Sequence, residues 1–171
     1  MQTRKKQEII NEALSEFLHV MMWRRDLHKH PELSFEEYRT ARYISEALAR
    51  DGIEYRPVAG TGILARIDGT GGDEGLRGKA VVLRADIDAL PITESPGVDF
   101  ASMNKGVMHA CGHDMHTAIL LGALRILSQH RDLFSGTVYG LFQPGEGLNP
   151  GGASLVLREQ PFEGSQIIAF V

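Results

Sequence analysis

Two uninterrupted apolar runs constrain the fold of this chain more than any other feature of its sequence. Residues Lys79–Ala85 (KAVVLRA) and Thr137–Phe142 (TVYGLF) are apolar nearly throughout, which is typical of strands that are buried on both faces of a sheet. Shorter strands are predicted at Ile53–Val58 and Gly62–Ile67, with the turn at residues 59–62 between them, and at Gln166–Val171. The chain is therefore expected to contain a central sheet.

Segments with helical periodicity alternate with these strands. Residues Lys6–His30 carry apolar side chains at helical spacing, and so do Met115–Gln129. Residues Gly152–Gln160 predict a short helix. The run Ser34-Phe-Glu-Glu37 has the pattern of a capping box and predicts a helix that begins there and continues to Leu48. Alternating helices and buried strands indicate an α/β domain with a mostly parallel or mixed central sheet.

Composition excludes several classes of function. The chain has 171 residues, a net charge of −4 and no long block of like charge, so we expect neither nucleic acid nor an anionic membrane as a partner. No apolar run reaches the roughly 18 residues of a membrane span, and the first eleven residues lack the apolar core of a secretory signal. The single cysteine, Cys111, cannot form an internal disulfide, which is typical of a reducing compartment. We therefore expect a cytoplasmic protein.

Polar residues gather at three places near the ends of the predicted strands. Asp86 and Asp88 follow the first buried strand, and Glu146 follows the second, between two glycines. The segment His109–His116 (HACGHDMH) immediately precedes the long third helix. In open α/β sheets, functional groups collect just beyond the carboxyl ends of the strands. The three clusters are therefore predicted to converge on one cleft.

The donor atoms in these clusters suit a divalent metal. Cys111 and His113 are alternate residues, so in an extended segment both side chains lie on one face. A thiolate and an imidazole suit zinc, or manganese, cobalt or nickel. Asp86 and Asp88 are also alternate residues, and two carboxylates that close need a cation or a proton between them. A metal held here would activate water near neutral pH.

Other interpretations of the same residues stay open. Asp114 is a suitable N-cap for the helix that follows, with His116 in its first turn. Contact with the helix dipole is enough to account for His28 at the end of the first helix, and the two aspartates are compatible with a solvated turn. Cys111 is also a candidate nucleophile with a histidine base. The two-residue spacing disfavours that alternative, because it rarely allows the hydrogen bond between thiol and imidazole.

Four longer segments strengthen the enzymatic interpretation. They are RRDLHKHPELSFEE (24–37), VVLRADIDALPI (81–92), GVMHACGHDMHTAILLGAL (106–124) and GTVYGLFQPGEG (136–147). Together, and in this order, they resemble the hippurate hydrolase and N-acyl-amino-acid amidohydrolase family of metallopeptidases, which includes enzymes that cleave indole-acetyl-amino acid conjugates. The resemblance implies a three-layer catalytic domain of the zinc-peptidase kind. It also implies two divalent metals per site (Zn, Mn, Co or Ni) and hydrolysis of the amide bond of N-acyl amino acids such as hippurate or N-acetyl conjugates.

The resemblance also assigns roles to individual residues. It implies that Cys111 and His113 are metal ligands, and that Asp88 orients a ligand or tunes the metal pair. It implies that Glu146 is the general base, which takes a proton from metal-activated water and gives one to the leaving amine. Asp86 stands where related peptidases carry a histidine ligand, so it is retained as a possible site residue without a defined role.

The chain departs from the family pattern in two respects. The family has a second glutamate, a metal ligand, directly after the general base, where this chain has Gly147. The family also has two further histidine ligands downstream, and an inserted lid domain that makes full-length relatives homo-oligomeric. Because the chain stops inside the apolar run that ends at Val171, residues 1–171 are expected to be the N-terminal portion of the catalytic domain, without the lid or the C-terminal portion.

Because of these departures, the predicted activity of the family and the predicted activity of this chain alone differ. The resemblance implies a metal-dependent amidohydrolase with a small-molecule N-acyl amino acid as substrate. Two protein ligands are fewer than the four that zinc normally takes, so this chain alone is expected to be inactive. The alternative is a non-catalytic truncated remnant, or a binding module, that lacks a complete metal site.

Overall fold

A mixed five-stranded sheet forms the centre of the protein. The computed structural model describes residues 2–95 and 97–171, with side chains from residue 5 onward. The strands are β1 (Glu54–Val58), β2 (Gly62–Asp68), β3 (Lys79–Asp86), β4 (Thr137–Gln143) and β5 (Gln166–Phe170). Their order is β1-β2-β4-β3-β5. The pairs β1–β2 and β2–β4 are antiparallel, whereas β3 is parallel to both β4 and β5. The predicted mixed sheet is confirmed.

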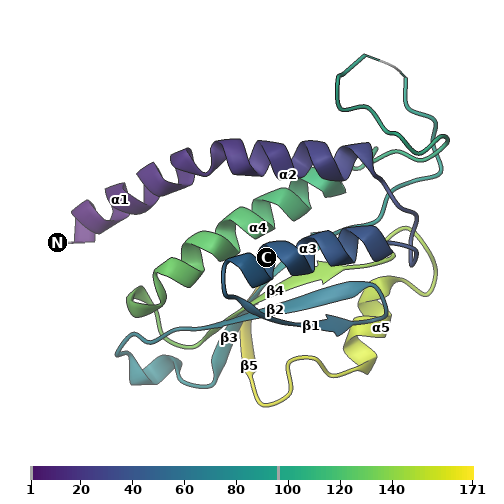
Figure 1. The fold of residues 1–171 in the computed structure, drawn as a ribbon. Coiled ribbons are helices and arrows are strands. Elements are labelled where there is room, and N and C mark those ends of the chain that lie inside the picture. The colour runs from purple at the N-terminus through teal and green to yellow at the C-terminus, as the bar shows by residue number, and fades with distance from the viewer. Residues whose placement is uncertain (1, 96) are drawn as a thin grey trace.

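Helices cover both faces of this sheet, as Figure 1 shows. The helices on one face are α1 (Gln2–Ser15), α2 (Phe17–Lys29), α3 (Tyr38–Arg50) and α4 (His113–Gln129), and α5 (Gly152–Arg158) lies on the other face. Two single 3₁₀ turns, Glu74–Leu76 and Arg131–Leu133, lie in connections. The α/β class and the three-layer arrangement are confirmed.

Each face of the sheet has its own apolar core. The larger core includes Ile44 of α3, Leu124 of α4 and Phe142 of β4, all fully buried. The smaller core includes Val82 of β3 and Val156 of α5. Because β3 and β4 contribute to both cores, neither strand has a solvent face, and this is why their sequences are continuously apolar.

The predicted capping box is wrong. The helix expected from Ser34 begins at Tyr38 as α3, and its cap residue makes no side-chain cap hydrogen bond. Instead, the backbone N–H groups of Arg39 and Thr40 donate to the two carboxylate oxygens of Glu32, at 3.0 and 2.8 Å. The side chains of Ser34 and Glu37 bind residues far away in the sequence. A local pattern cannot anticipate such partners, which explains the error.

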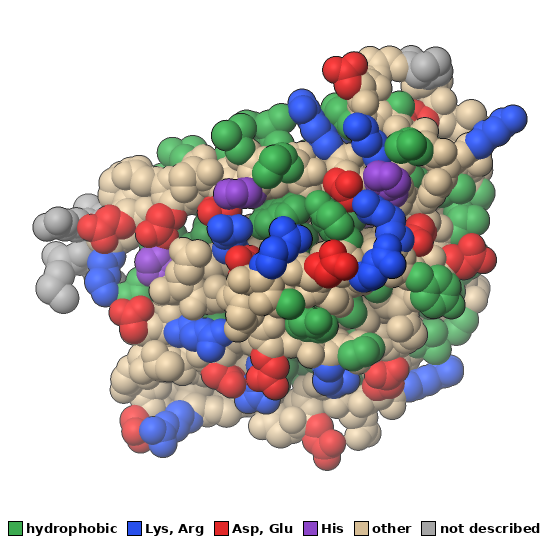
Figure 2. All heavy atoms as spheres, viewed as in Figure 1, with side chains coloured by type: hydrophobic (Ala, Val, Ile, Leu, Met, Phe, Trp, Pro, Cys, Tyr) green, Lys and Arg blue, Asp and Glu red, His purple; other side chains and the backbone are tan. Residues whose placement is uncertain are grey.

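The first predicted helix is interrupted once. Residues 2–29 form α1 and α2, which are separated at Glu16. Backbone hydrogen bonds from Glu16 to Glu12 and from Val20 to Glu16 keep the helical spacing across this interruption. No helix in the described part of the chain is long and apolar enough to cross a bilayer. Acidic and basic side chains intermix over the face shown in Figure 2, so neither sign dominates the described part of that face.

Candidate metal centre and active site

The parallel pairing of β3 with β4 places two of the predicted polar clusters side by side. Asp86, the last residue of β3, is the register partner of Gln143, the last residue of β4. The backbone N–H of Ile87 then donates to the carbonyl oxygen of Gln143 at 3.0 Å. The loops that carry Asp88 and Glu146 therefore leave the sheet at the same level, as the sequence predicted for two strand ends.

The start of α4 joins these loops through His113. Nδ1 of His113 lies 2.8 Å from the carbonyl oxygen of Asp88 and 3.2 Å from its carboxylate atom Oδ1. Both partners are acceptors, so Nδ1 carries a proton, and whenever the ring is neutral its lone pair is on Nε2. Hydrogen bonding to Asp88 raises the pKa of His113. An imidazole held by a carboxylate in this way is the usual arrangement around a metal-binding histidine.

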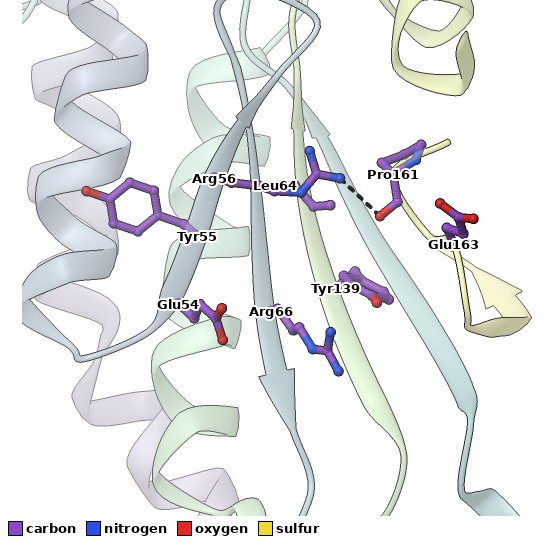
Figure 3. A pocket seen from close by; sticks show the side chains of 8 residues that line it. All are labelled: Glu54, Tyr55, Arg56, Leu64, Arg66, Tyr139, Pro161 and Glu163. Atoms are coloured by element: carbon purple, nitrogen blue, oxygen red, sulfur yellow. Dashed lines mark hydrogen bonds between the residues drawn. The ribbon is translucent and has the colours of Figure 1, made fainter. Parts of the chain in front are cut away.

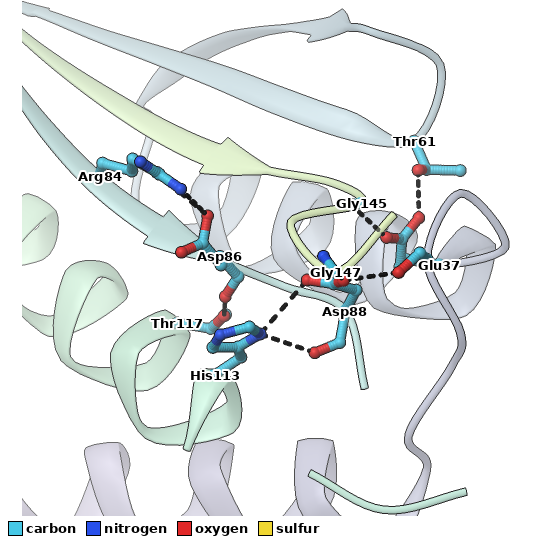
Figure 4. A network of polar contacts seen from close by, with 10 residues as sticks. Glu37, Thr61, Arg84, Asp86, Asp88, His113, Thr117, Gly145 and Gly147 are labelled. Atoms are coloured by element: carbon cyan, nitrogen blue, oxygen red, sulfur yellow. Dashed lines mark hydrogen bonds and ion pairs between the residues drawn. The ribbon is translucent and has the colours of Figure 1, made fainter. Parts of the chain in front are cut away.

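Asp88 is the best-connected carboxylate of the site (Figure 4). It is buried, and its Oδ2 accepts hydrogen bonds from the hydroxyl of Ser34 at 2.7 Å and from the N–H of Gly147 at 3.0 Å. Burial by itself raises the pKa of Asp88. The hydrogen bonds from His113, Ser34 and the Gly147 backbone together outweigh this effect and hold the pKa well below its usual range. Asp88 is therefore a carboxylate at neutral pH.

Asp86 does not share a partner with Asp88. Its Oδ1 accepts from Nε and Nη2 of Arg84, at 3.0 and 2.7 Å, so a guanidinium neutralises it. The backbone carbonyl of Asp86 accepts from the hydroxyl of Thr117 in α4, at 3.2 Å. Asp86 and Asp88 thus have separate protein donors, and the expectation of a cation between them stays a prediction.

The predicted ligand pair does not lie on an extended segment. Cys111 is exposed, Gly112 has a left-handed conformation with φ of 82°, and His113 is the first residue of α4. The alternation argument for Cys111 and His113 is therefore wrong, although the two residues still flank one turn. Glu146 is exposed in the loop after β4. Among the described residues, no group of three or more His, Cys, Asp and Glu side chains is arranged to hold a metal ion.

Position 147 has room for a side chain. A Cβ atom built there meets Oδ2 of Asp88, Cδ2 of Leu90 and Oγ of Ser34, each at 3.6 Å, which is ordinary van der Waals contact. The glutamate of the family pattern would thus start beside Asp88. The residues present fit a divalent cation in part, because they offer a thiol and a carboxylate-supported imidazole, and they leave about half of a four-ligand shell unfilled.

A second polar network supports the start of α4. Oδ2 of Asp114 accepts from Nε of Arg24 at 2.8 Å and lies 2.8 Å from Nδ1 of the buried His28. Nε2 of His28 lies 3.0 Å from Oε1 of Glu94, in the long connection between β3 and α4. The N-cap interpretation of Asp114 is wrong, because α4 begins before it and its carboxylate binds α2. Contact with the helix dipole does not account for His28, because its ring is buried between two carboxylates.

Sequence reasoning missed several residues around the site. Ser34, Glu37 and Arg84 contact its loops but belong to no motif that predicts those contacts. His109 is also buried, and neither of its ring nitrogens has a hydrogen-bond partner among the described residues. Burial lowers the pKa of His109 to about 4, so the ring is neutral at pH 7. Ser34 and Glu37 lie in the family-like segment 24–37 and fit a capping box, but the capping box indicated the wrong partners.

A cavity of about 210 Å³ lies elsewhere, on the sheet face that α5 covers (Figure 3). Its lining includes Arg56, Arg66 and Tyr139, and Nη2 of Arg56 donates to the carbonyl oxygen of Pro161 at 3.2 Å. No candidate site residue lines it. The polar cluster around Asp88, rather than this cavity, is therefore the candidate active site.

Comparison with known proteins agrees with this arrangement. The pattern of Peptidase family M20/M25/M40 matches residues 82–171. The N-acyl-L-amino acid amidohydrolase of Geobacillus stearothermophilus is 46% identical over 150 residues, which are 87% of this chain and 39% of that protein. The IAA-amino acid hydrolase ILR1-like 6 of Arabidopsis thaliana is 48% identical over 134 residues, which are 78% of this chain and 28% of that protein. The chain thus spans at most about two fifths of the length of these relatives.

Solved structures give the same result. An aminohydrolase from methicillin-resistant Staphylococcus aureus superposes with a TM-score of 0.86 at 42% identity, over 95% of this chain and 41% of that one. The YXEP protein of Bacillus subtilis, described as a dinuclear metal binding peptidase, superposes with a TM-score of 0.81 at 42% identity, over 89% of this chain and 42% of that one. The family that the sequence motifs indicated is confirmed, and the chain belongs to Peptidase family M20/M25/M40.

Proposed function

We propose that this chain is the N-terminal part of the catalytic domain of a metal-dependent amidohydrolase that cleaves the amide bond of N-acyl amino acids. The observation that carries the proposal is the contact between His113 and Asp88, next to the loop with Glu146. The names of the relatives from Geobacillus stearothermophilus and Arabidopsis thaliana support the substrate class. We further expect the full-length enzyme to be cytoplasmic and homo-oligomeric.

Each residue of the site has a distinct role in this proposal. Cys111 and His113 would hold a divalent cation (Zn, Mn, Co or Ni), as one of two per complete site. When bound, such a cation supplies Lewis-acid activation of water and of the amide carbonyl. Asp88 keeps the His113 ring in the tautomer that leaves Nε2 free. Glu146 is exposed and takes a proton from the attacking water, and the same carboxyl group later protonates the leaving amine nitrogen.

The chain by itself is proposed to have little or no activity. Gly147 offers no carboxylate, and the described residues contain no three-donor cluster. A cation held by Cys111 and His113 alone would be bound weakly. This incomplete donor set also favours the second candidate function, a non-catalytic module that retains the fold without turnover.

The decisive experiment measures metal content and turnover together. The chain is incubated with Zn²⁺, Mn²⁺, Co²⁺ or Ni²⁺, desalted and analysed for bound metal, and then assayed with hippurate and N-acetyl amino acids. Cys111→Ser and His113→Ala should lower metal binding, whereas His116→Ala, an exposed histidine of the same turn, should not. Metal binding that is unchanged in both Cys111→Ser and His113→Ala would refute the assigned ligands. Full-length protein that likewise retains no metal and shows no turnover would support the non-catalytic module.

Two further outcomes concern the mechanism. Turnover that depends on added metal and is lost in Glu146→Gln supports the hydrolase directly. Loss of turnover in Cys111→Ser with unchanged metal content would instead indicate a thiol nucleophile, and the metal mechanism would be wrong.

A further inference from the structure

One short segment contacts both loops of the candidate active site. Residues Glu32–Glu37, here called the brace, connect α2 to α3 and lie beside the chain that follows β3. Leu33 forms a parallel bridge with Ala89, and the N–H of Ala89 donates to the carbonyl oxygen of Glu32 at 2.8 Å. The brace is therefore fixed by its backbone to the loop that carries Asp88.

Glu37 fixes the brace to the second loop. Its side chain is fully buried, and its Oε1 accepts the N–H of Gly145 at 2.9 Å. Its Oε2 accepts the hydroxyl of Thr61, in the turn between β1 and β2, at 2.5 Å. As Figure 4 shows, the carboxylate thus joins α3, the β1–β2 turn and the residue directly before Glu146. Both of its oxygens have partners, as a buried carboxylate requires.

Phe35 holds the same loop from another direction. A Cβ atom on Gly145 would lie 2.3 Å from the Phe35 ring, so the ring packs directly on the Gly145 backbone. Phe35 has a φ of 65°, which is unfavourable for an aromatic residue and persists only where the surroundings demand it. Gly145 also has a positive φ, 58°. Position 145 therefore needs glycine both for its conformation and for this contact.

Ser34 closes the connection on the Asp88 side. Its hydroxyl donates to Oδ2 of Asp88, and the same oxygen accepts the N–H of Gly147. The two residues that flank Glu146 are thus held by two carboxylates, Gly145 by Glu37 and Gly147 by Asp88. Glu146 itself is exposed, so its placement depends on these backbone anchors.

We propose that Glu37 is a positioning residue, which fixes the backbone beside Glu146 through its hydrogen bond to Gly145. The inference rests on the proposed function in one respect, since it gives Glu146 a catalytic task. The anchor itself is a property of the described residues and is measurable without turnover.

The test compares three variants of the present chain by amide hydrogen exchange in NMR spectra. Glu37→Ala removes both acceptors, so the Gly145 amide should exchange at least about tenfold faster. Glu37→Gln should restore slow exchange, because the amide oxygen can accept from Gly145 while its NH₂ group donates to Thr61. Glu36→Ala, which removes an exposed glutamate from the same segment, should change nothing at Gly145. The Gly147 amide, anchored by Asp88, serves as an internal reference.

The outcomes separate a positioning role from a structural one. If Gly145 exchanges equally slowly in Glu37→Ala, or if Glu37→Gln behaves like Glu37→Ala, the proposal is overturned. If Glu37→Ala does not fold, Thr61→Val decides. It removes the hydroxyl that holds Oε2, and it should accelerate exchange at Gly145 several-fold; unchanged exchange overturns the proposal.

An activity measurement then connects the anchor to function. In a preparation that hydrolyses an N-acyl amino acid, Glu37→Ala should lower kcat about tenfold or more with little change in KM, and Glu37→Gln should recover most of it. If the full-length protein hydrolyses no such substrate, the proposed function fails, while the exchange data on the present chain still decide the role of Glu37. A kcat that does not change in Glu37→Ala, despite faster exchange at Gly145, overturns the positioning role.

Discussion

The imidazole of His113 donates from Nδ1 to Asp88, whose carbonyl oxygen lies at 2.8 Å and whose Oδ1 lies at 3.2 Å. This contact joins the first turn of α4 to the loop after β3. It fixes the orientation of the ring and leaves Nε2 available to bind a cation. Asp88, just after β3, and His113, the first residue of α4, are thereby held together.

Replacing Asp88 by asparagine should weaken metal binding. The change removes the charge that supports His113, and loss of such a partner typically lowers metal affinity by about 10- to 100-fold. Titration with Co²⁺, followed through its thiolate and d–d absorption bands, measures the affinity. Asp68→Asn, the same change at the end of β2, should leave the affinity unaltered. Equal affinities for Asp88→Asn and the parent chain would exclude the proposed role of Asp88.

Introducing glutamate at position 147 should strengthen metal binding. The site accepts a Cβ at ordinary contact distances of 3.6 Å, so Gly147→Glu should fold normally and raise Co²⁺ affinity about tenfold or more by adding a carboxylate donor. Gly145→Glu is the matched control, because its Cβ would collide with Phe35 and it should lose thermal stability. A Gly147→Glu protein that folds and binds no more tightly contradicts the inferred place of the missing ligand.

Removing the carboxylate of Glu32 should destabilise α3. Glu32 accepts the first free N–H groups of that helix, and caps of this kind contribute on the order of 1 kcal/mol. Thermal unfolding followed by circular dichroism should show Glu32→Ala melting about 2–4 °C lower than the parent chain. Glu36→Ala should melt with the parent. If Glu36→Ala lowered the melting temperature as much as Glu32→Ala, the cap would lie elsewhere.

Acid should loosen the connection between β3 and α4. The N–H of Ser102 and the His28 ring hydrogen-bond to Glu94 and lower its pKa from the ordinary value of 4.5. A depressed folded-state pKa means that the contribution of Glu94 to stability is complete above about pH 4.5 and is lost as pH falls through the folded value. Urea unfolding from pH 7 to pH 3 should show the difference between parent and Glu94→Gln shrinking below pH 4.5. A stability difference that grows as the pH falls would contradict this prediction.

Local sequence patterns predicted the framework of the molecule well. The buried strand expected at Lys79–Ala85 is β3 (Lys79–Asp86), and that expected at Thr137–Phe142 is β4 (Thr137–Gln143). Such strands are recognisable because burial on both faces demands apolar side chains throughout. The parallel neighbours β3 and β4 then brought two acidic loops together, as the strand-end argument predicted.

The contacts within the site were not predictable in this way. Glu37 and Gly145 are 108 residues apart, and His28 and Asp114 are 86 apart. A short sequence pattern shows which side chains can form hydrogen bonds. It does not show which distant residues they bind. Ser34 and Glu37 fitted a capping box, and Asp114 fitted an N-cap. All three side chains instead bind residues that are distant in the sequence. Errors of this kind occur where a side chain could form a local capping hydrogen bond but forms a tertiary contact at the candidate site instead.

The register of β3 against β4 limits how this chain can change by insertion and deletion. Because Asp86 lies opposite Gln143, gaining or losing one residue in either strand would rotate everything beyond it to the opposite side of the sheet. Asp88 would then turn away from α4, and Glu146 would leave its neighbours. Length variation among descendants of this sequence should therefore accumulate in the glycine-rich connection at residues 69–78, while the spacing from Lys79 to Asp88 and from Thr137 to Glu146 is kept.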